Sequence, residues 1–285
     1  MSVCMSVKTK PIQINTILNV LDNIQNEKIK MLACLMYWCA ARVGEPLPYV
    51  KYEFEYEGEG GRRSRHWRAG FDKYKLKSKK PVVISRGIDL DTIKLEEDRI
   101  VFEAFPVFKA RDKLETSLAV VPRYYNSYSE FNPAKPVEMV NPHFQFMWKF
   151  ILNRKLETES FREAGIICYL FNPDEKFSWN GKGDIPPEIV SVYARFYEKT
   201  KKRLARVLKK VNPSFKPHQL RVSRATEVGL RSGNVFVVKG ITRHRTVEQA
   251  SQYVVSQDLW RQLVSYGFAI EKKKEQKEGE VDGGV

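Results

Sequence analysis

Cysteine is scarce in this sequence, and its few copies fall into no pattern that binds a metal. The chain has four cysteines, and no two of them form a CxxC pair or a zinc-ligand spacing: Cys4, Cys34, Cys39 and Cys168. Cys34 and Cys39 lie in the apolar run MLACLMYWCAA, where we expect buried thiols. This use of cysteine indicates a reducing compartment.

The sequence also lacks any segment that would direct it to a membrane. Its N-terminus carries no apolar signal core, and no apolar run reaches 18 residues. No amphipathic anchoring segment with a lipid-facing aromatic edge is present either. We therefore expect a cytoplasmic protein with no membrane partner, in the host cytoplasm if a virus encodes the chain.

Two further enzymatic signatures are missing. No Walker A sequence is present, which argues against an NTP-driven motor, and the GEGG run at 58–61 lacks the strand–GxGxxG–helix context of a dinucleotide site, so we expect a turn there. Four acidic residues cluster without the spacing of metal ligands: Asp89, Asp91, Glu96 and Glu97. The sequence therefore predicts neither a metal site nor a cofactor.

Positive charge is what the sequence has in excess. Lys and Arg number 49 against 34 acidic residues, which gives a formal net charge of +15. Such an excess favours a polyanionic partner, nucleic acid first and an acidic membrane surface second. With 42% hydrophobic residues, the 285-residue chain can also fill a large core.

Hydrophobic periodicity predicts an α+β fold that is mainly helical, with a small antiparallel β-sheet on one edge. Alternation broken by glycines predicts a long hairpin over 50–86, and a second alternating stretch predicts the sheet over 87–122. The stretch 123–190 reads as irregular around one helix. The predicted helices are 13–27, 27–45, 143–155, 186–211, 218–233 and one that begins at Thr246.

Three pairs of residues carry candidate chemistry. On the predicted helices, Arg42 and Glu45 are three residues apart and share a face, as do His218 and Arg221. An imidazole beside a guanidinium suits a phosphate, because Arg grips two of its oxygens and His can transfer a proton. His244 and Tyr253, nine residues apart, would face opposite ways on one straight helix.

A capping box resolves the third pair. In ITRHRTVEQASQYV, Thr246 and Gln249 fit the S/T-x-x-E/Q pattern, so a helix would begin at Thr246 and leave His244 in the turn before it. The chain then bends between His244 and Tyr253. We therefore predict that these two side chains converge on one point.

Taken together, these motifs resemble the tyrosine recombinases of the phage-integrase and Xer type. The matching stretches, in order, are ARVGE, HQLR followed by RVSRAT, and a histidine with a tyrosine nine residues later. The interval of 23 residues from Arg221 to His244 is the usual one in that family. The resemblance covers roughly residues 12–255.

The resemblance implies DNA cleavage and rejoining through a 3′-phosphotyrosine, with no cofactor. Tyr253 would be the nucleophile and His218 its base, Arg42 and Arg221 would neutralise the phosphate, and His244 would hydrogen-bond a non-bridging oxygen. Glu45 would support Arg42. A lysine on a β-hairpin would be the general acid; Lys109 is the first choice, with Lys113 and Lys77 as alternatives.

The implied function is site-specific recombination, for integration or excision of a mobile element such as a viral genome. A dimer or tetramer would act on double-stranded DNA. Two alternatives stay open: DNA relaxation in the manner of a type IB topoisomerase, and a catalytically silent DNA-binding protein of the same fold. The residues predicted to contact DNA are Arg62, Arg63, Lys77, Lys201, Lys202 and Arg243.

The sequence departs from the family in its domain plan and at one site position. We expect a single catalytic domain over 1–270 with a disordered charged tail over 271–285 and no separate N-terminal DNA-clamping domain. Insertions at about 50–86 and 126–185 are candidates to replace that clamp. Arg243 stands directly before His244, where the family usually has glycine.

Overall fold

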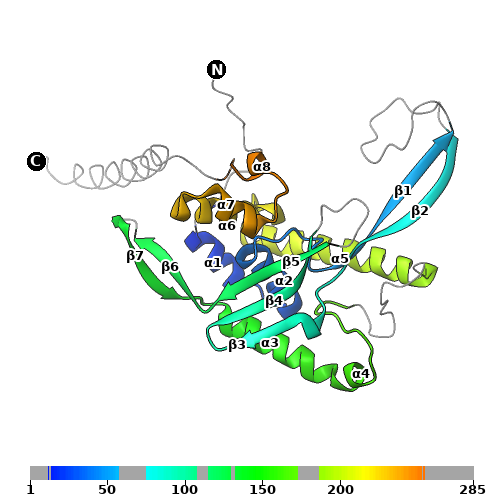
Figure 1. Ribbon diagram of the computed structural model, residues 1–285, viewed down its shortest axis with the longest axis horizontal. Coiled ribbons are helices and arrows are strands. Elements are labelled where there is room, and N and C mark those ends of the chain that lie inside the picture. Colours follow the sequence, from blue (N-terminus) through cyan, green and yellow to red (C-terminus); the bar gives the residue numbers. More distant parts are fainter. Residues whose placement is uncertain are drawn as a thin grey trace, which may run out of the picture.

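The computed structural model describes residues 12, 14–57, 75–107, 115–129, 132–172, 186–251 and 253. Within these residues, helices pack around one buried helix, and antiparallel strands form a three-stranded sheet and two hairpins (Figure 1). The predicted α+β class with a small antiparallel sheet is confirmed. No helix in this part of the chain combines the length and apolar content needed to cross a membrane.

Helix α2 (Glu27–Trp38) is the centre of the core. Its apolar residues occur on every face, and nine of its 12 residues are buried. The Asn26 side chain caps its start by accepting a hydrogen bond from the Ile29 amide at 3.1 Å. Helix α1 (Ile14–Asp22) and three later helices pack against it, so α2 fixes the positions of the surrounding elements.

The strands follow the predicted order. Strands β1 (Pro48–Glu57) and β2 (Lys75–Arg86) form the expected hairpin, which projects from the body at the upper right of Figure 1. A short 3₁₀ turn, η1 (Leu90–Thr92), leads into the sheet of β3 (Ile93–Glu96), β4 (Arg99–Val107) and β5 (Glu115–Pro122). Its inner face buries Ile100, Phe102 and Phe105 against the core.

A second hairpin lies in the stretch 123–190, which was predicted to be irregular around one helix, so that prediction was wrong. Strands β6 (Tyr124–Ser129) and β7 (Asn132–Val140) pair antiparallel. The prolines in this stretch argued against strands, because Pro has no N–H to donate to the hydrogen bonds of a central strand. In a two-stranded ribbon both strands are edges, so Pro136 is tolerated opposite Tyr128. Helices α3 (Phe144–Glu157) and α4 (Glu159–Glu163) follow.

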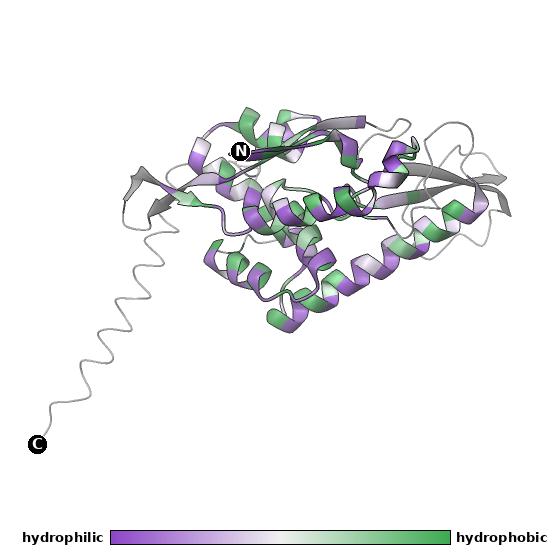
Figure 2. Cartoon of the chain, turned by 90° about the horizontal axis from the view of Figure 1, so that it is seen from below, coloured by the Kyte–Doolittle hydropathy of each residue, from purple (hydrophilic) through white to green (hydrophobic). Residues whose placement is uncertain are grey.

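The C-terminal half of the described chain is helical. It comprises α5 (Pro187–Val211), α6 (Pro217–Ser232), α7 (Val235–Thr242) and α8 (Val247–Ser251). Hydrophobic and hydrophilic residues alternate along α5, the longest of these helices (Figure 2). Gly233 ends α6 in the left-handed conformation, with φ 58°, at the predicted Ser-Gly turn. Helix α6 packs on α2 and α7, and α7 packs on α8.

A buried histidine links three of the helices. His143, at the start of α3, is 1% exposed. Trp38 Nε1 donates to His143 Nδ1 at 3.4 Å, and because an indole nitrogen can only donate, Nδ1 must accept. The ring proton therefore sits on Nε2 and points to the Asp22 carboxylate 3.0 Å away. Burial lowers the pKa of His143 despite Asp22, with Lys30 contributing, so the neutral ring is favoured.

We expect His143 to make the protein less stable in acid. In the unfolded chain the imidazole takes up a proton near pH 6.5, whereas the folded site resists it. The free energy of unfolding should therefore fall as the pH drops below 6.5, by up to about 1.4 kcal/mol per pH unit for this group, until the folded pKa is passed. Urea unfolding between pH 7.5 and 5.0 should give a shallower pH slope for His143→Gln than for wild type; equal slopes would contradict this.

Candidate functional site

The turn that follows α2 holds the first pair of candidate residues. The predicted helix 27–45 ends at Trp38 instead, because Ala40 adopts φ 45°, which a continuing helix cannot contain. Arg42 and Glu45 are therefore not on a helical face. A turn brings them together: the Glu45 amide donates to the Arg42 carbonyl at 2.9 Å. The predicted helix was wrong over 39–45, but the predicted pairing of Arg42 with Glu45 is confirmed.

Glu45 is the hub of a buried charge cluster. It is 0% exposed, and its Oε1 accepts from the Arg42 guanidinium at 3.2 Å while its Oε2 accepts from the Arg42 amide at 2.9 Å. Arg243 donates to Oε2 at 2.9 Å, and Arg221 Nη1 lies 3.7 Å from the same oxygen. Burial opposes ionisation, but Arg243, Arg221 and Arg42 together hold the pKa of Glu45 below its usual value.

Arg221 is fully buried where α6 crosses the turn after α2. Its guanidinium donates to the carbonyls of Ala40 and Thr242, and its Nη2 lies 3.5 Å from His244 Nε2. Burial lowers its pKa to about 9, so the side chain still carries its charge at neutral pH. Two carbonyls, a carboxylate and a histidine thus fix one cation between α2, α6 and α7.

His218 lies one turn before Arg221 on α6, as the sequence predicts, and is exposed. Although part of its side chain is exposed, the surrounding protein desolvates the ring and so lowers the pKa of His218, and the positive charges of Arg221 and Arg42 lower it further. The neutral imidazole is therefore favoured at neutral pH. A neutral imidazole near two guanidinium groups has the protonation state that a general base needs.

His244 and Tyr253 meet, and the predicted bend between them is confirmed. Their rings are stacked, with centroids 5.6 Å apart and planes 13° from parallel. Helix α8 begins at Val247, and Gln249 N donates to Thr246 Oγ1 at 3.4 Å, the first half of the predicted capping box. Tyr253 is 6% exposed and packs in a small apolar cluster with Val222, Ala225, Val238 and Ala250.

Thr242 sets the orientation of the His244 ring. Its hydroxyl donates to the Val238 carbonyl at 2.6 Å and lies 2.9 Å from His244 Nδ1. Because a hydroxyl has one hydrogen, Nδ1 must be the donor in the second bond. The neutral ring therefore presents the lone pair of Nε2 toward Arg221. Thr242 was not among the predicted site residues; its position two before His244 was the only signal available.

Arg243 does not lie where a DNA contact would be expected. It is 7% exposed, and its guanidinium donates to the carbonyls of Cys39, Ala40 and Ile241 as well as to Glu45. A side chain so engaged has little surface to offer a phosphate. The structure thus gives Arg243 an interior role in place of the predicted contact with DNA.

The other predicted DNA contacts fall in different parts of the chain. Lys201 and Lys202 are exposed on α5. They are two of the exposed basic side chains of α5, which are Arg195, Lys199, Lys201, Lys202, Arg203, Arg206, Lys209 and Lys210. Arg62 and Arg63 lie outside the described residues. Lys77 belongs to β2, of which the structure describes the backbone.

The candidate general acids Lys109 and Lys113 also lie outside the described residues. Strand β4 ends at Val107 and β5 begins at Glu115, which pairs with Arg245 at 3.5 Å. The strand ends on either side of both lysines therefore lie beside the turn that carries His244. Lys77 lies on the other hairpin, formed by β1 and β2. The described residues therefore do not decide which of the three lysines is the general acid.

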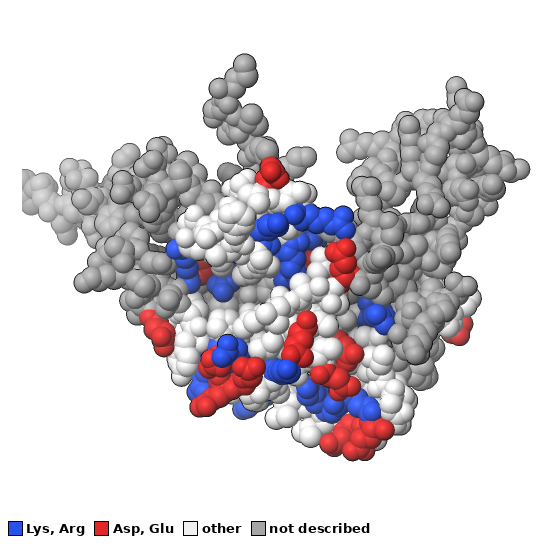
Figure 3. All heavy atoms as spheres, in the orientation of Figure 1, with Lys and Arg blue, Asp and Glu red and all other residues white. Residues whose placement is uncertain are grey.

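Basic side chains are also present on the surface near α8, at the end of the molecule that carries His244. In the view of Figure 3, Lys and Arg gather below α8, whereas acidic and basic side chains mix toward α3 and α4. Among the described residues, no group of three His, Cys, Asp or Glu side chains could hold a metal ion. Two of the four acidic residues noted in the sequence form ion pairs: Asp91 with Arg162 at 2.7 Å, and Glu96 with Arg99 at 2.8 Å.

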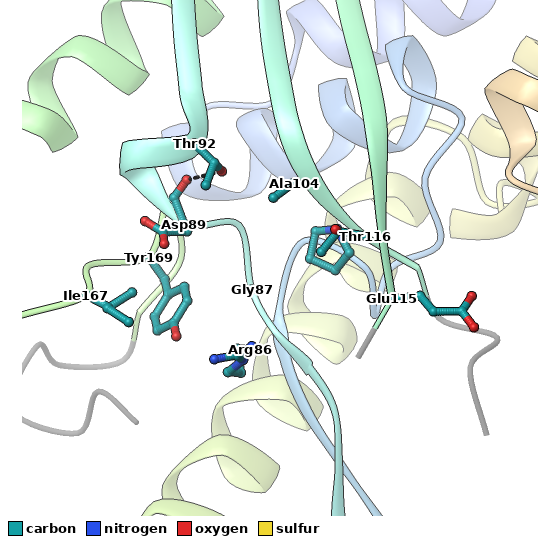
Figure 4. Close-up of a pocket in the computed structure, with 10 residues that line it drawn as sticks. Arg86, Gly87, Asp89, Thr92, Ala104, Glu115, Thr116, Ile167 and Tyr169 are labelled. Atoms are coloured by element: carbon teal, nitrogen blue, oxygen red, sulfur yellow. Dashed lines mark hydrogen bonds between the residues drawn. The ribbon is translucent and has the colours of Figure 1, made fainter. Parts of the chain in front are cut away.

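A small pocket of about 120 Å³ lies beside strands β4 and β5 (Figure 4). Arg86, Asp89, Glu115 and Tyr169 are among its lining, and Thr92 Oγ1 donates to the Asp89 carbonyl at 2.8 Å. None of the predicted catalytic residues lines it. We therefore assign the candidate site to the Glu45 cluster and not to this pocket.

Comparison with known proteins adds no family assignment: no protein-family model matches the chain, and no curated protein matches its sequence.

Proposed function

We propose that this protein is a tyrosine-type site-specific recombinase that cleaves and rejoins DNA strands. One observation carries the proposal. Residues from three distant stretches of the chain, Arg42 with Glu45, Arg221, and His244 with Tyr253, join into one chain of contacts. These are the residues that the recombinase motifs single out, and chance placement of motifs gives no reason for them to meet. The α+β fold is then a recombinase-type catalytic domain.

The reaction needs no cofactor, because one phosphoester is exchanged for another. The Tyr253 oxygen attacks the scissile phosphorus, the new O–P bond forms, and the bond to the 5′-oxygen breaks. Tyrosine is a poor nucleophile at neutral pH, so a base must take its proton, and neutral His218 is suited to that task. A lysine, Lys109 in the first instance, returns a proton to the leaving 5′-oxygen.

The guanidinium groups supply the electrostatic stabilisation. Charge builds on the non-bridging oxygens as the phosphate becomes pentacoordinate, and Arg42 and Arg221 are held beside Glu45 before DNA binds. Donors that are already in place cost no reorganisation in the transition state. Arg42, with its side chain 20% exposed, can contact the phosphate directly, whereas Arg221, which is 0% exposed, contributes its positive charge from inside the protein. His244 can donate to a phosphate oxygen once Nε2 carries a proton.

The test of the proposal is covalent trapping. The protein is incubated with a pool of nicked duplex DNA in EDTA, denatured, and separated on a gel. We expect a protein–DNA adduct, and peptide mapping should place the phosphate on Tyr253. Binding without any adduct would instead support the catalytically silent alternative. Relaxation of supercoiled plasmid without exchange between paired sites would support the topoisomerase-like alternative.

The exposed basic side chains of α5 form the proposed surface for the DNA backbone. Each phosphate neutralised by a lysine releases counterions and adds about 0.9 to the slope of log affinity against log salt. The double variant Lys201→Ala/Lys202→Ala should therefore lower that slope by about 1.8. Lys94→Ala is the matched control, because Lys94 is exposed on the sheet, away from α5, and pairs with Glu103 as Lys201 pairs with Glu198. A slope equal to that of the control would remove α5 from the interface.

A further inference from the structure

Arg243 occupies a backbone position that favours glycine. It ends α7 with φ 55°, in the left-handed region, where a side chain is disfavoured and glycine is not. The sequence nevertheless places the longest basic side chain there. The contacts of the Arg243 guanidinium can offset the energetic cost of this backbone conformation.

The Arg243 side chain ties three parts of the site together. It donates to the Cys39 carbonyl at 2.9 Å and the Ala40 carbonyl at 3.3 Å, in the turn after α2. It donates to Glu45 Oε2 at 2.9 Å, and its guanidinium lies 4.7 Å from the centre of the Phe105 ring on β4. Through the Arg243 side chain, the segment that carries His244 is joined to the end of α2, to the Arg42–Glu45 turn and to the sheet.

The same contacts decide where Arg221 sits. Both guanidinium groups reach the Ala40 carbonyl, and both approach Glu45 Oε2. Arg243 takes the close position on that oxygen at 2.9 Å, and Arg221 stays 3.7 Å away. Without Arg243, the buried carboxylate would have only Arg42 and Arg221 to balance it, and Arg221 would be drawn from His244 toward Glu45.

We propose that Arg243 is a positioning residue, which saturates Glu45 and the Ala40 carbonyl so that Arg221 stays aligned with His244 and the scissile phosphate. The inference rests on the proposed function, since it assigns the guanidinium a part in phosphoryl transfer. Arg243 touches no DNA in this account. It is the chain's own replacement for the glycine of related motifs, and it contributes a buried cation that glycine cannot.

The test separates cleavage from binding and from folding. Arg243→Gly suits the backbone but removes the cation, and Arg243→Lys keeps a cation without the fork of donors. Arg245→Gly is the matched control, two residues on and half exposed. For each variant, the rate of adduct formation is measured at saturating nicked duplex. The dissociation constant, its salt slope and the melting temperature are measured on the same preparations.

We expect Arg243→Gly to slow cleavage by about 10²-fold, the scale of an ångström-level misplacement at a reacting centre. Its DNA affinity should stay within about twofold of wild type with an unchanged salt slope. Arg243→Lys should be intermediate and Arg245→Gly should match wild type. If Arg243→Gly melts below the assay temperature, Arg243→Lys carries the test.

Three results would overturn the inference. Cleavage by both Arg243 variants at the rate of the Arg245→Gly control would show that Arg221 needs no such support. A loss of affinity that matches the loss of cleavage, with a lower salt slope, would make Arg243 a direct DNA contact. Failure of the wild type to form any adduct would instead remove the proposed function, and the inference with it.

Discussion

We expect Tyr253→Phe to bind nicked duplex DNA as wild type does and to form no covalent adduct with it. Phenylalanine keeps the ring that stacks on His244 and fills the cluster with Val222 and Ala250, so the fold should be unchanged. Only the attacking oxygen is lost. Cleavage should fall by at least about 10⁴-fold, as loss of a covalent nucleophile does elsewhere. The measurement is adduct yield on a denaturing gel, with affinity measured in parallel.

Tyr124→Phe provides the matched control for this substitution. Tyr124 is 44% exposed on β6, so the same chemical change there should leave the adduct yield intact. An adduct that persists in Tyr253→Phe would mean that another of the 13 tyrosines is the nucleophile. Peptide mapping of that adduct would identify it, and the assignment of Tyr253 would be withdrawn.

The second large effect is expected at Arg221. Removing one pre-organised donor from a developing oxyanion typically costs about 10²–10³-fold in rate. Arg221→Lys keeps the charge but loses the fork that reaches Ala40, Thr242 and His244, so we expect a loss of this size. Affinity for duplex should weaken only modestly, because Arg221 is 0% exposed.

Arg221→Ala is less informative, because it removes the arginine donor of the Thr242 carbonyl and reduces the charge balance of Glu45. Breaking such a buried pair costs about 3–5 kcal/mol of stability. Arg224→Lys is the better control for Arg221→Lys: Arg224 is buried on the same helix but pairs with Glu227 at 3.0 Å. That variant should lose stability and keep its cleavage rate. Equal losses of binding and cleavage in Arg221→Lys would make Arg221 a binding residue.

The amino-acid sequence alone determined the elements whose signals are local. Apolar spacing predicts α5, and with the Ser-Gly turn it predicts α6, because a helix has a fixed period and glycine a cheap left-handed cap. Alternation predicts the hairpin at 50–86 and a small antiparallel sheet over 87–122, which the structure shows with three strands. The Thr246 cap predicts the bend that lets His244 meet Tyr253, since the cap depends only on neighbouring residues.

Only the tertiary structure decided where α2 ends and what Glu45 and Arg243 do. Gly44 and Pro46 predict that the helix ends, but not that it ends already at Trp38. The left-handed turn at Ala40 forms where Arg221 and Arg243, about 200 residues away, donate to its carbonyl. From the sequence, Glu45 was expected to support Arg42 alone, and Arg243 was expected to contact DNA. A buried charge is stable only beside its partners, and those partners become neighbours only when distant segments pack.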